Sequence, residues 1–539
     1  MAELIVNRRH DTGASMPQDA ANDAQKASEL EARVKELSAT VEELRSQLAW
    51  FRRNMFGRKS EQMPNDPEEQ ALLELEDSMI DKAARSAPEK KAKGGSRKGR
   101  QTRAMRMPPD LPVKEETIIP LAVQEAPEKW RRISQEVTER LEMEPGKLFL
   151  MRTIRPTFVS LEEPFAPPVT SPAPVALVEG QFFGASLLAE LCLDKFLSHL
   201  PLYRQSRAFL WKYGVDLPMS TLCNAIGSCA RQVDIVVRHM NREMWAGGYV
   251  QMDLTPIRFL GQKTKSGAAA TGQMWVATVP GGNIVYHWRL TKQAAEAESI
   301  IPENFRGILQ CDGGSELACW MKGGKHRRRP PPQGVRRAGC FAHVRRKFEK
   351  IWKESGQKCE TSHEFLLLIA DLYAVESEAR ASDLTGKDYD AMRLALRQER
   401  SIAPMAKLKT RLDKELPKHR PKSPLGKAIA YALSQWASLQ IYLEDGRCEI
   451  DDNLVENAIR PSAVGKKNYL FMGSPDSGHW AATFYSLIGS CLNRKINPRE
   501  YLHWLFTKLP TVSAPNAGQF TPAAYAALRT QGAPLTAVA

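Results

Sequence analysis

The sequence predicts a multidomain α/β protein whose strand-rich core follows long helices and is interrupted by a helical insertion. Three observations predict this fold class. The chain has 539 residues, too many for a single hydrophobic core. Apolar residues recur mainly at helical spacing up to about residue 246, and short apolar runs typical of strands follow in residues 247–314. Helical spacing then returns in residues 315–445.

The composition indicates a polyanionic partner. The chain has 76 Lys and Arg against 62 Asp and Glu, a formal net charge of +14, although charge alone does not separate DNA from RNA or a membrane surface. No apolar run approaches the roughly 18 residues that a membrane span needs, and the N-terminus has no signal-peptide apolar region. The nine cysteines are scattered without a C-x-x-C pair. We therefore expect a reduced, cytoplasmic setting, with no disulfides and no membrane partner.

The pattern of residues 27–58 predicts a leucine-zipper-like coiled coil, after a polar, disordered segment at residues 1–26. Apolar side chains recur in alternating steps of four and three, at Leu30, Val34, Leu37, Val41, Leu44, Leu48, Phe51 and Met55. An average step of about 3.5 residues, with valine at a and leucine at d, favours a parallel dimer. We expect a homodimer or higher oligomer through this helix. An amphipathic helix packed on its own chain is the alternative.

A charged helix and basic linker are predicted at residues 59–109. Arg58 and Lys59 lie where the zipper ends, and eight Lys or Arg fall between Lys90 and Arg106. Such a segment can lie along DNA phosphates, so Arg58 and Lys59 are candidate DNA-binding residues. A solvated linker that binds nothing specific explains the same composition.

Three further regions precede the strands. Residues 110–162 predict a small mixed domain, and residues 163–178 a linker stiffened by proline. Residues 179–246 predict two or three helices that form a helical DNA-binding region, with Arg204 and Arg207 on its surface. A plain helical bundle explains this region nearly as well.

From residue 247 the sequence predicts a strand with Asp253, a hairpin, a helix, and a buried strand that ends at Asp312. This order is the opening of a ribonuclease-H-like fold, in which the first and fourth strands lie side by side. Residues 247–314 are therefore expected to form the first part of such a core. Asp253 and Asp312 on adjacent strands can share divalent metal ions.

Paired carboxylates suit Mg²⁺ chemistry on phosphates. Mg²⁺ is a hard cation that takes few protein ligands and leaves positions for water and phosphate oxygens. Two such ions, about 3.5–4 Å apart, activate the attacking oxygen and stabilise the leaving oxygen of an in-line displacement. The site needs a third acid, which we expect from a helix later in the chain.

The stretch Glu449–Phe471 supplies candidates for this third acid. Asn453-x-x-Glu456 fits a capping box, which is the ordinary explanation of a helix start. A helix-borne acid before a basic turn also fits a metal ligand, and on that ground we select Glu456, with Asp452 as its nearest rival. The remaining acids are interpreted as solvated loop residues: Glu449 and Asp451.

The second part of the core is expected at residues 446–490, beyond a mainly helical, basic insertion at residues 315–445. Residues 491–539 predict a C-terminal helical tail.

Cys340 and His343 lie one helical turn apart in the insertion, followed by the candidate DNA-binding residues Arg345 and Arg346. A zinc site needs two more ligands, and the sequence shows no partner pair. His343 can instead lie near the acids and contact the scissile phosphate, or simply pack its helix. The sequence leaves these interpretations open.

Several long motifs then occur in order, and they cover most of the chain: FGRKSEQ, KFLSHLPLYRQ, MDLTPIRFL, LQCDGG, GCFAHVRRKF and DDNLVENAIRPSAVGKKNYLFMGS. Together they resemble the IS66 family of bacterial insertion-sequence transposases, which are DDE enzymes with a ribonuclease-H-like core. By position, the resemblance implies Asp253, Asp312 and Glu456 as catalytic acids and metal ligands. It also matches Cys340 and His343 to the C/D-x-x-H motif that follows the second acid in many DDE transposases.

The resemblance implies an enzyme that binds the terminal inverted repeats of its element, cleaves DNA strands and joins the freed 3′-OH ends to target DNA. It further implies two Mg²⁺ (or Mn²⁺) ions per active site, double-stranded DNA as partner, and a bacterial, nucleoid-associated protein. Accessory proteins of the same element are compatible with it. Lys466 and Lys467, after the Glu456 helix, are candidates for phosphate contact.

The chain also departs from the family pattern. Members typically carry a small zinc-binding domain with paired cysteines after the basic linker, whereas residues 110–162 have no cysteine. We therefore expect a degenerate domain without structural zinc there. Leu254 follows the first acid, where many relatives have a glutamate that is not one of the catalytic acids.

Two other functions stay open on the sequence. A non-catalytic, dimeric DNA-binding regulator of the element uses the same zipper and basic segments without metal. A nuclease on the same core hydrolyses nucleic acid without joining it.

Overall fold

A computed structural model describes residues 112–530, except for residues 145, 163–164, 166, 265–266, 314–315, 322–329, 332 and 512–513. Contacts divide the chain into two units, Met1–Leu75 and Glu76–Ala539, and every described residue belongs to the second. The segments at residues 1–26, 27–58 and 59–109 lie outside the described residues, as do Arg58 and Lys59. The coiled coil and the basic linker therefore stay predictions.

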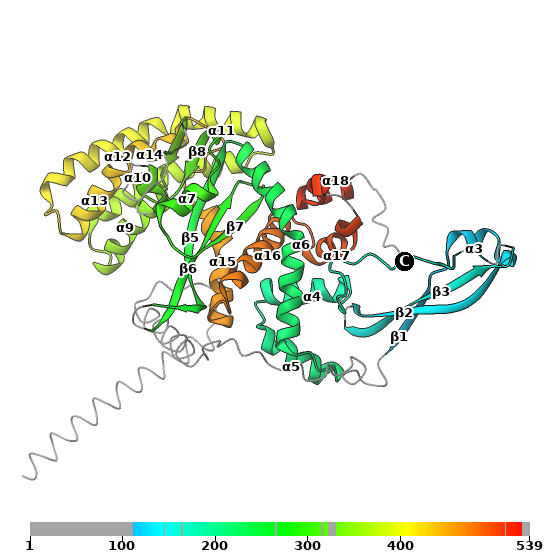
Figure 1. The fold of residues 1–539 in the computed structure, drawn as a ribbon. Helices are drawn as coiled ribbons and strands as arrows, with labels where there is room; N and C mark the ends of the chain where they lie inside the picture. Colours follow the sequence, from blue (N-terminus) through cyan, green and yellow to red (C-terminus); the bar gives the residue numbers. More distant parts are fainter. Residues whose placement is uncertain are drawn as a thin grey trace, which may run out of the picture. The chain divides into compact units, whose positions relative to one another are not determined.

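A four-stranded sheet occupies the region predicted as a small mixed domain (Figure 1). Its strands are β1 (Val113–Thr117), β2 (Trp130–Glu144), β3 (Lys147–Ser160) and β4 (Val169–Thr170), and the short helix α3 (Leu121–Glu125) follows β1. β2 and β3 form a long antiparallel hairpin, whose turn uses Gly146 at φ +76°. β4 pairs with β3, so the predicted linker at residues 163–178 is partly strand. The prolines of this linker lie on either side of Val169–Thr170, so the two residues that pair with β3 keep their backbone N–H groups.

Three helices fill the region predicted as helical at residues 179–246: α4 (Ala185–Phe196), α5 (Leu202–Tyr213) and α6 (Met219–Ala246). α5 ends at Gly214, which has φ +65° and donates its N–H to the Leu210 carbonyl, as a left-handed C-cap does. α6 buries apolar side chains with helical periodicity, among them Leu222, Ile226, Val233 and Val237.

Five strands form the central sheet, in the order β7-β6-β5-β8-β9. They are β5 (Tyr249–Lys263), β6 (Ala269–Thr278), β7 (Ile284–Arg289), β8 (Gly307–Gln310) and β9 (Val335–Ala338), with the short helices α7 (Ala294–Ile300) and α8 (Glu316–Met321) between them. β5, β6 and β7 pair antiparallel, whereas β8 runs parallel to β5 and β9 runs parallel to β8. The prediction that the first and fourth strands are neighbours is confirmed, because β5 pairs with β8.

β9 is a strand within the range predicted as a mainly helical insertion, residues 315–445. Its residues read VRRA, without the apolar run that signals a buried strand. The strand forms because β8 offers a parallel partner, and because the buried Arg337 donates to Gln435 and Ser438 at 2.6 and 2.7 Å. The central sheet therefore extends to Ala338, and the helices predicted as the insertion follow it.

The two faces of the sheet contact different hydrophobic clusters. Successive side chains of a strand point to opposite faces. Val250 and Leu309 belong to the larger cluster, whereas Tyr249 and Ile308 belong to the second. β5 and β8 are therefore covered on both faces, as expected for strands in parallel pairing.

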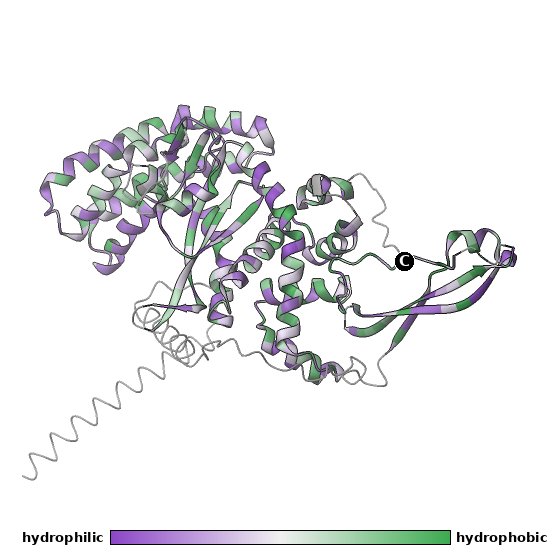
Figure 2. Cartoon of the chain, viewed as in Figure 1, coloured by the Kyte–Doolittle hydropathy of each residue, from purple (hydrophilic) through white to green (hydrophobic). Residues whose placement is uncertain are grey.

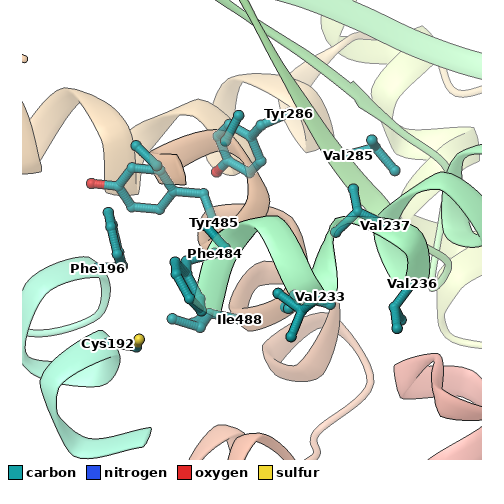
Figure 3. Packing of buried hydrophobic residues seen from close by; sticks show 14 of the residues in the cluster. Cys192, Phe196, Val233, Val236, Val237, Val285, Tyr286, Phe484, Tyr485 and Ile488 are labelled. Carbon is teal, nitrogen blue, oxygen red and sulfur yellow. The ribbon is translucent and has the colours of Figure 1, made fainter. Parts of the chain in front are cut away.

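The larger cluster packs α4, α6 and α16 (Pro475–Asn493) against β7. Figure 3 shows Phe196 of α4 beside Phe484 and Tyr485 of α16, with Tyr286 of β7 nearby. The rings of Phe196 and Phe484 stack with centroids 5.2 Å apart. Such aromatic pairs add about 0.5–1.5 kcal/mol to the burial of their area.

Two serines of α16 complete the hydrogen bonding of the edge strand β7. The Ser486 and Ser490 hydroxyls accept the backbone N–H groups of Tyr286 and Ile284, both at 2.8 Å. The edge of the sheet is thus satisfied by side chains of a helix rather than by a further strand.

The predicted helical tail at residues 491–539 is helical in much of its described part and packs into the larger cluster. α16 itself continues to Asn493, and α17 (Pro498–Lys508) and α18 (Pro522–Thr530) follow. Tyr501 and Tyr525 are buried in the cluster, with ring centroids 5.5 Å apart. Their apolar faces are recognisable only in the fold, because α17 packs on α4 from far away in the sequence.

The helices of the predicted insertion are α9 (Phe341–Glu354), α10 (Glu360–Arg380), α11 (Gly386–Arg400), α12 (Ile402–Glu415), α13 (Pro424–Ser434) and α14 (Trp436–Leu439). All of them except α11 contribute apolar side chains to the second cluster, together with Tyr249 and Ile308 of the sheet. Figure 2 shows these helices striped by hydrophilic and hydrophobic residues, as expected for helices with one buried face. Among the described residues, no helix is long and apolar enough to cross a membrane.

A buried ion group joins α10 to α11. Glu376 accepts hydrogen bonds from Arg393 and Arg397, and all three side chains are at most 2% exposed. Burial alone raises the pKa of Glu376, but hydrogen bonds and charge from Arg397 and Arg393 outweigh burial and hold this pKa below its usual range. Arg393 also donates to Glu449 at 2.8 Å. The ion group therefore anchors the start of the Glu449–Phe471 stretch to the insertion.

Removing the central charge tests this anchor. We expect Glu376→Gln to lower the free energy of unfolding of the insertion by about 3–5 kcal/mol, because Arg397 stays buried without a carboxylate and Arg393 keeps only Glu449. The measurement is urea unfolding of the full chain, followed by hydrogen exchange in α10 and α11. The matched control is Glu378→Gln on the same helix, whose exposed pair with Arg400 contributes about 0–1 kcal/mol.

The same carboxylate gives a pH dependence with a defined sign. The pKa of Glu376 is lower in the folded than in the unfolded protein. The stability that Glu376 gives the fold is therefore complete above the unfolded-state pKa and is lost as pH falls through the folded-state pKa. An equal loss of stability in the two variants at neutral pH would contradict the role of Glu376.

Candidate active site

Asp253 and Asp312 lie side by side on one face of the central sheet. The parallel ladder between β5 and β8 ends at the pair Gln251↔Gln310. Each acid follows its glutamine by two residues and thus points to the same face as that glutamine. The structure therefore brings these two predicted residues together.

Gln251 and Gln310 are fully buried and tie the two strands to the third-acid stretch. The Gln251 amide donates to Gln310 Oε1 at 3.0 Å and to the Asp451 carbonyl at 2.9 Å. The Gln310 amide donates to the carbonyls of Gly339 and Glu449, both at 2.9 Å. These bonds hold the segment before the third-acid helix against the ends of β5 and β8.

The helix α15 (Asn453–Tyr469) begins differently from the prediction. Asp452 is its N-cap residue and makes no side-chain capping bond, so the capping box from Asn453 to Glu456 is wrong. The backbone N–H of Val455, at N3, donates instead to Gln251 Oε1 of β5 at 3.1 Å. Since the sheet caps the helix, the Glu456 carboxylate is not used as a cap.

The interpretation of Glu449 and Asp451 as solvated loop acids is also wrong. Glu449 is bound by Arg393, and Asp451 is buried, accepting from Tyr373 at 2.8 Å and from the Asn453 amide at 2.8 Å. Both acids therefore hold the helix start in position and are not available as exposed ligands.

His343 of α9 lies between the acids. Its Nε2 atom is 3.8 Å from Asp312 Oδ2 and 3.7 Å from Glu456 Oε1, and its Nδ1 atom is 3.6 Å from Asp452 Oδ1. Burial alone lowers the pKa of His343, but interactions with Asp452 and Asp312 outweigh burial and raise it. The His343 imidazole thus lies between Asp312, which follows a strand, and Asp452 and Glu456, which lie at the start of a helix.

Asp253 shares this electrostatic environment. Burial raises the pKa of Asp253 to about 6, and the charges of Asp452 and Glu456 add to this effect, while the Leu254 backbone N–H and His343 oppose it. The predicted residues Asp253, Asp312, Glu456 and His343 therefore meet in one site. Asp452, predicted as a rival of Glu456, is a further member of it.

Glu456 is paired with an arginine, and Asp312 accepts a hydrogen bond from a tyrosine. Arg346 of α9 binds both carboxylate oxygens of Glu456. The Tyr431 hydroxyl of α13 donates to Asp312 Oδ1 at 2.9 Å. The sequence has no signal for Tyr431, since its helix reads as apolar packing and its partner lies 119 residues away.

The other predicted DNA-binding residues lie outside this cluster of acids. Arg345 is exposed on α9, 4.0 Å from Glu349. Lys466 donates to the Pro256 carbonyl of β5 at 3.4 Å, and Lys467 is exposed beside it. Both lysines follow Glu456 by some ten residues on one helix, which is about 15 Å along its axis.

Comparison with known proteins identifies the family. A family model described as "Transposase IS66 family" matches residues 180–480, more than half of the chain. The chain belongs to the IS66 transposase family. A second model, described as "Transposase C of IS166 homeodomain", matches residues 43–115, which lie mostly outside the described residues. Membership of the IS66 family supports a transposase function, and with it an interaction with DNA.

Two curated relatives come from Sinorhizobium fredii (strain NBRC 101917 / NGR234). The uncharacterized protein y4qI is 30% identical over 387 residues, which are 70% of this chain and 68% of y4qI. The uncharacterized protein y4jD is 29% identical over 477 residues, which are 85% of this chain and 89% of y4jD. The similarity to y4jD thus extends over most of the length of both proteins.

The buried glutamine pair gives a direct test of how the acids are held. We expect Gln251→Met to speed amide exchange in peptides that contain Val455, because the Val455 N–H and the Asp451 carbonyl lose their partner. Each buried unsatisfied group costs about 1–3 kcal/mol. The measurement is hydrogen exchange with mass spectrometry on the full chain.

The control is Gln398→Met, which removes one amide bond to the Leu443 carbonyl in the insertion. It should leave exchange at Val455 as in the wild type. Unchanged exchange at Val455 in Gln251→Met would overturn the capping role of Gln251.

Proposed function

We propose that this chain is a DDE transposase that cleaves DNA at the terminal inverted repeats of its element and joins the freed 3′-OH ends to target DNA. The observation that carries the proposal is the meeting of Asp253, Asp312 and Glu456, from two adjacent strands and a helix, around His343. Family membership supports the same chemistry.

The central sheet supports a ribonuclease-H-like core. Three antiparallel strands followed by two parallel strands, in the order β7-β6-β5-β8-β9, match the expectation from the strand and acid pattern. On this proposal the core consists of residues 247–314, β9 and residues 446–490, and the helices from α9 to α14 are the insertion. The predicted coiled coil at residues 27–58 would pair protomers so that two element ends meet.

The donor set fits Mg²⁺ or Mn²⁺. Asp253, Asp312 and Glu456 offer only carboxylate oxygens, the ligands that hard divalent cations prefer. The raised pKa of Asp253 reflects burial among like charges, which a bound cation would relieve. When bound, two such ions supply Lewis-acid activation of water and of the scissile phosphate.

Two side chains of α9, Arg346 and His343, would contact the negatively charged DNA phosphate. Arg346 binds both oxygens of Glu456, so its guanidinium has to leave the carboxylate before Glu456 can hold a metal. A DNA phosphate is a suitable new partner, because the guanidinium fork matches phosphate as well as carboxylate. His343, beside Asp312, is within reach of the same phosphate and would stabilise its charge.

Substituting the three acids tests the proposal. We expect Asp253→Asn, Asp312→Asn and Glu456→Gln each to lower the rate of strand cleavage and strand transfer at least about 100-fold, since each loses roughly 3 kcal/mol of charge stabilisation. The assay uses purified full chain, DNA with the flanking element ends, and Mg²⁺. Binding of that DNA should be retained.

Glu444→Gln is the matched control, because Glu444 is exposed and pairs with Arg336 away from these acids. Cleavage that survives in Glu456→Gln would remove that residue from the site. Hydrolysis without joining would indicate a nuclease, and DNA binding without any cleavage in the wild type would indicate a regulator.

DNA binding would use α5 as well as α9. Arg204, Arg207 and Trp211 lie exposed along α5, and the Arg207 guanidinium is 5.9 Å from the centroid of the Trp211 ring. Two arginines beside an exposed aromatic ring on one helix suit a contact with DNA phosphates. This supports the proposal that residues 179–246 bind DNA.

Salt dependence measures this contact. We expect the double variant Arg204→Ala/Arg207→Ala to reduce the slope of log affinity against log salt by about 2, because two phosphate contacts release fewer counterions. Arg529→Ala, which removes an exposed pair with Glu500, is the control and should keep the wild-type slope. An unchanged slope in the double variant would exclude α5 from the DNA interface.

A further inference from the structure

Three side chains beside the carboxylates form a group of a different chemical kind. Cys340, His343 and Asp452 each offer one ligand atom, and these atoms all lie within 4.8 Å of one another. We propose that they bind a transition-metal ion of the Zn²⁺ class. The group is separate from the three-carboxylate set, because it includes none of Asp253, Asp312 and Glu456.

The backbone brings the three ligands together from two helix starts. Cys340 is the N-cap residue of α9 and His343 lies one turn further, while Asp452 is the N-cap residue of α15. Neither cap residue makes a side-chain capping bond to its own helix. Their side chains therefore face each other, and the Cys340 Sγ atom lies 2.8 Å from Asp452 Oδ1.

Two polar atoms of the group are left without a hydrogen bond. Asp452 is 1% exposed, and its Oδ2 atom has no hydrogen-bond partner; the same is true of His343 Nδ1. A buried carboxylate oxygen without a partner is costly, and a cation between it and the imidazole would satisfy both atoms. This is the observation that points to a ligand rather than to internal packing alone.

Burial and the charge of Asp452 raise the pKa of the Cys340 thiol, which donates to Asp452, so a bound cation would have to displace the thiol proton. The Asp452 backbone N–H donates to Cys340 Sγ at 3.4 Å, and both anionic ligands lie at helix N-termini, where the helix dipole favours negative charge. A thiolate, an imidazole and a carboxylate are the ligand types that Zn²⁺ takes in proteins, whereas Mg²⁺ avoids sulfur. Binding releases the thiol proton of Cys340 to solvent.

Such an ion would give His343 a fixed orientation. With the metal on Nδ1, the remaining ring proton is on Nε2, the atom 3.8 and 3.7 Å from Asp312 and Glu456. Arg346 Nη1 lies 3.3 Å from the same nitrogen and would have to turn away from an Nε2–H donor. The metal would thus hold an N–H donor at the edge of the carboxylate site. In the sequence Cys340 and His343 lacked further ligands, and Asp452, 112 residues from Cys340, supplies the third.

Cobalt substitution tests this site without any activity measurement. Purified full chain is stripped with a chelator and titrated with Co²⁺. We expect the near-ultraviolet charge-transfer absorption of a cobalt–thiolate bond in the wild type, at one equivalent, and its displacement by Zn²⁺. Asp452→Asn should weaken Zn²⁺ binding at least about tenfold, as expected for loss of one ligand.

Cysteine variants decide which thiol is the ligand. Cys340→Ser should abolish the charge-transfer band, whereas Cys359→Ser, at a half-buried cysteine before α10, should keep it. If Cys340→Ser fails to fold, His343→Asn serves instead and should shift the cobalt spectrum. The variant Asp253→Asn should keep the band, which separates this site from the proposed catalytic metals.

Absence of the band in folded wild-type protein would overturn the proposal and leave a thiol that donates to Asp452. Retention of the band in Cys340→Ser would overturn it as well. Either result leaves the transposase proposal intact, because that proposal is tested by cleavage and strand transfer on the three carboxylates.

Discussion

The hydrogen bonds made by Gln251 and Gln310 are the constraint on which the site depends. The two buried amides join β5 to β8 and bind three backbone groups of the segment 449–455. Their polar atoms are satisfied only when both strands and the start of α15 are in place, since a buried amide without partners is costly. Assembly of Asp253, Asp312 and Glu456 is thereby coupled to completion of the fold across some 200 residues of sequence.

The alternation of the strands places this polar network on a defined face. Val250 and Leu309 enter the larger hydrophobic cluster, while the glutamines and the acids two residues beyond them share the face of Tyr249 and Ile308. That face is covered by the insertion, whose helix α9 supplies His343 and Arg346. The insertion is therefore part of the site as well as a separately packed element, and the buried Glu376 group fastens it to the third-acid stretch.

The sequence predicts local features of this site well and tertiary ones poorly. Asp253 and Asp312 could be selected because apolar runs reveal strands, and the order of the strands predicts the neighbouring pair. The start of α15 was misjudged because its cap comes from Gln251, which no local pattern reveals. β9 and Tyr431 were missed for the same reason, since a parallel partner or a distant carboxylate gives them their role. Asp451 reads as a loop acid until the tyrosine and asparagine that bind it are known.

The serines of α16 have a consequence for how copies of the chain can associate. With Ser486 and Ser490 bound to the amides of β7, the outer edge of the sheet offers those groups to no incoming strand. At the opposite edge, Gly339 just after β9 donates to the Ser438 carbonyl of the insertion. Strand addition at these edges is thus disfavoured, so on the proposal that protomers pair, their contacts would not be made by strands of this sheet. Such contacts can form and separate without disturbing the sheet that holds the acids.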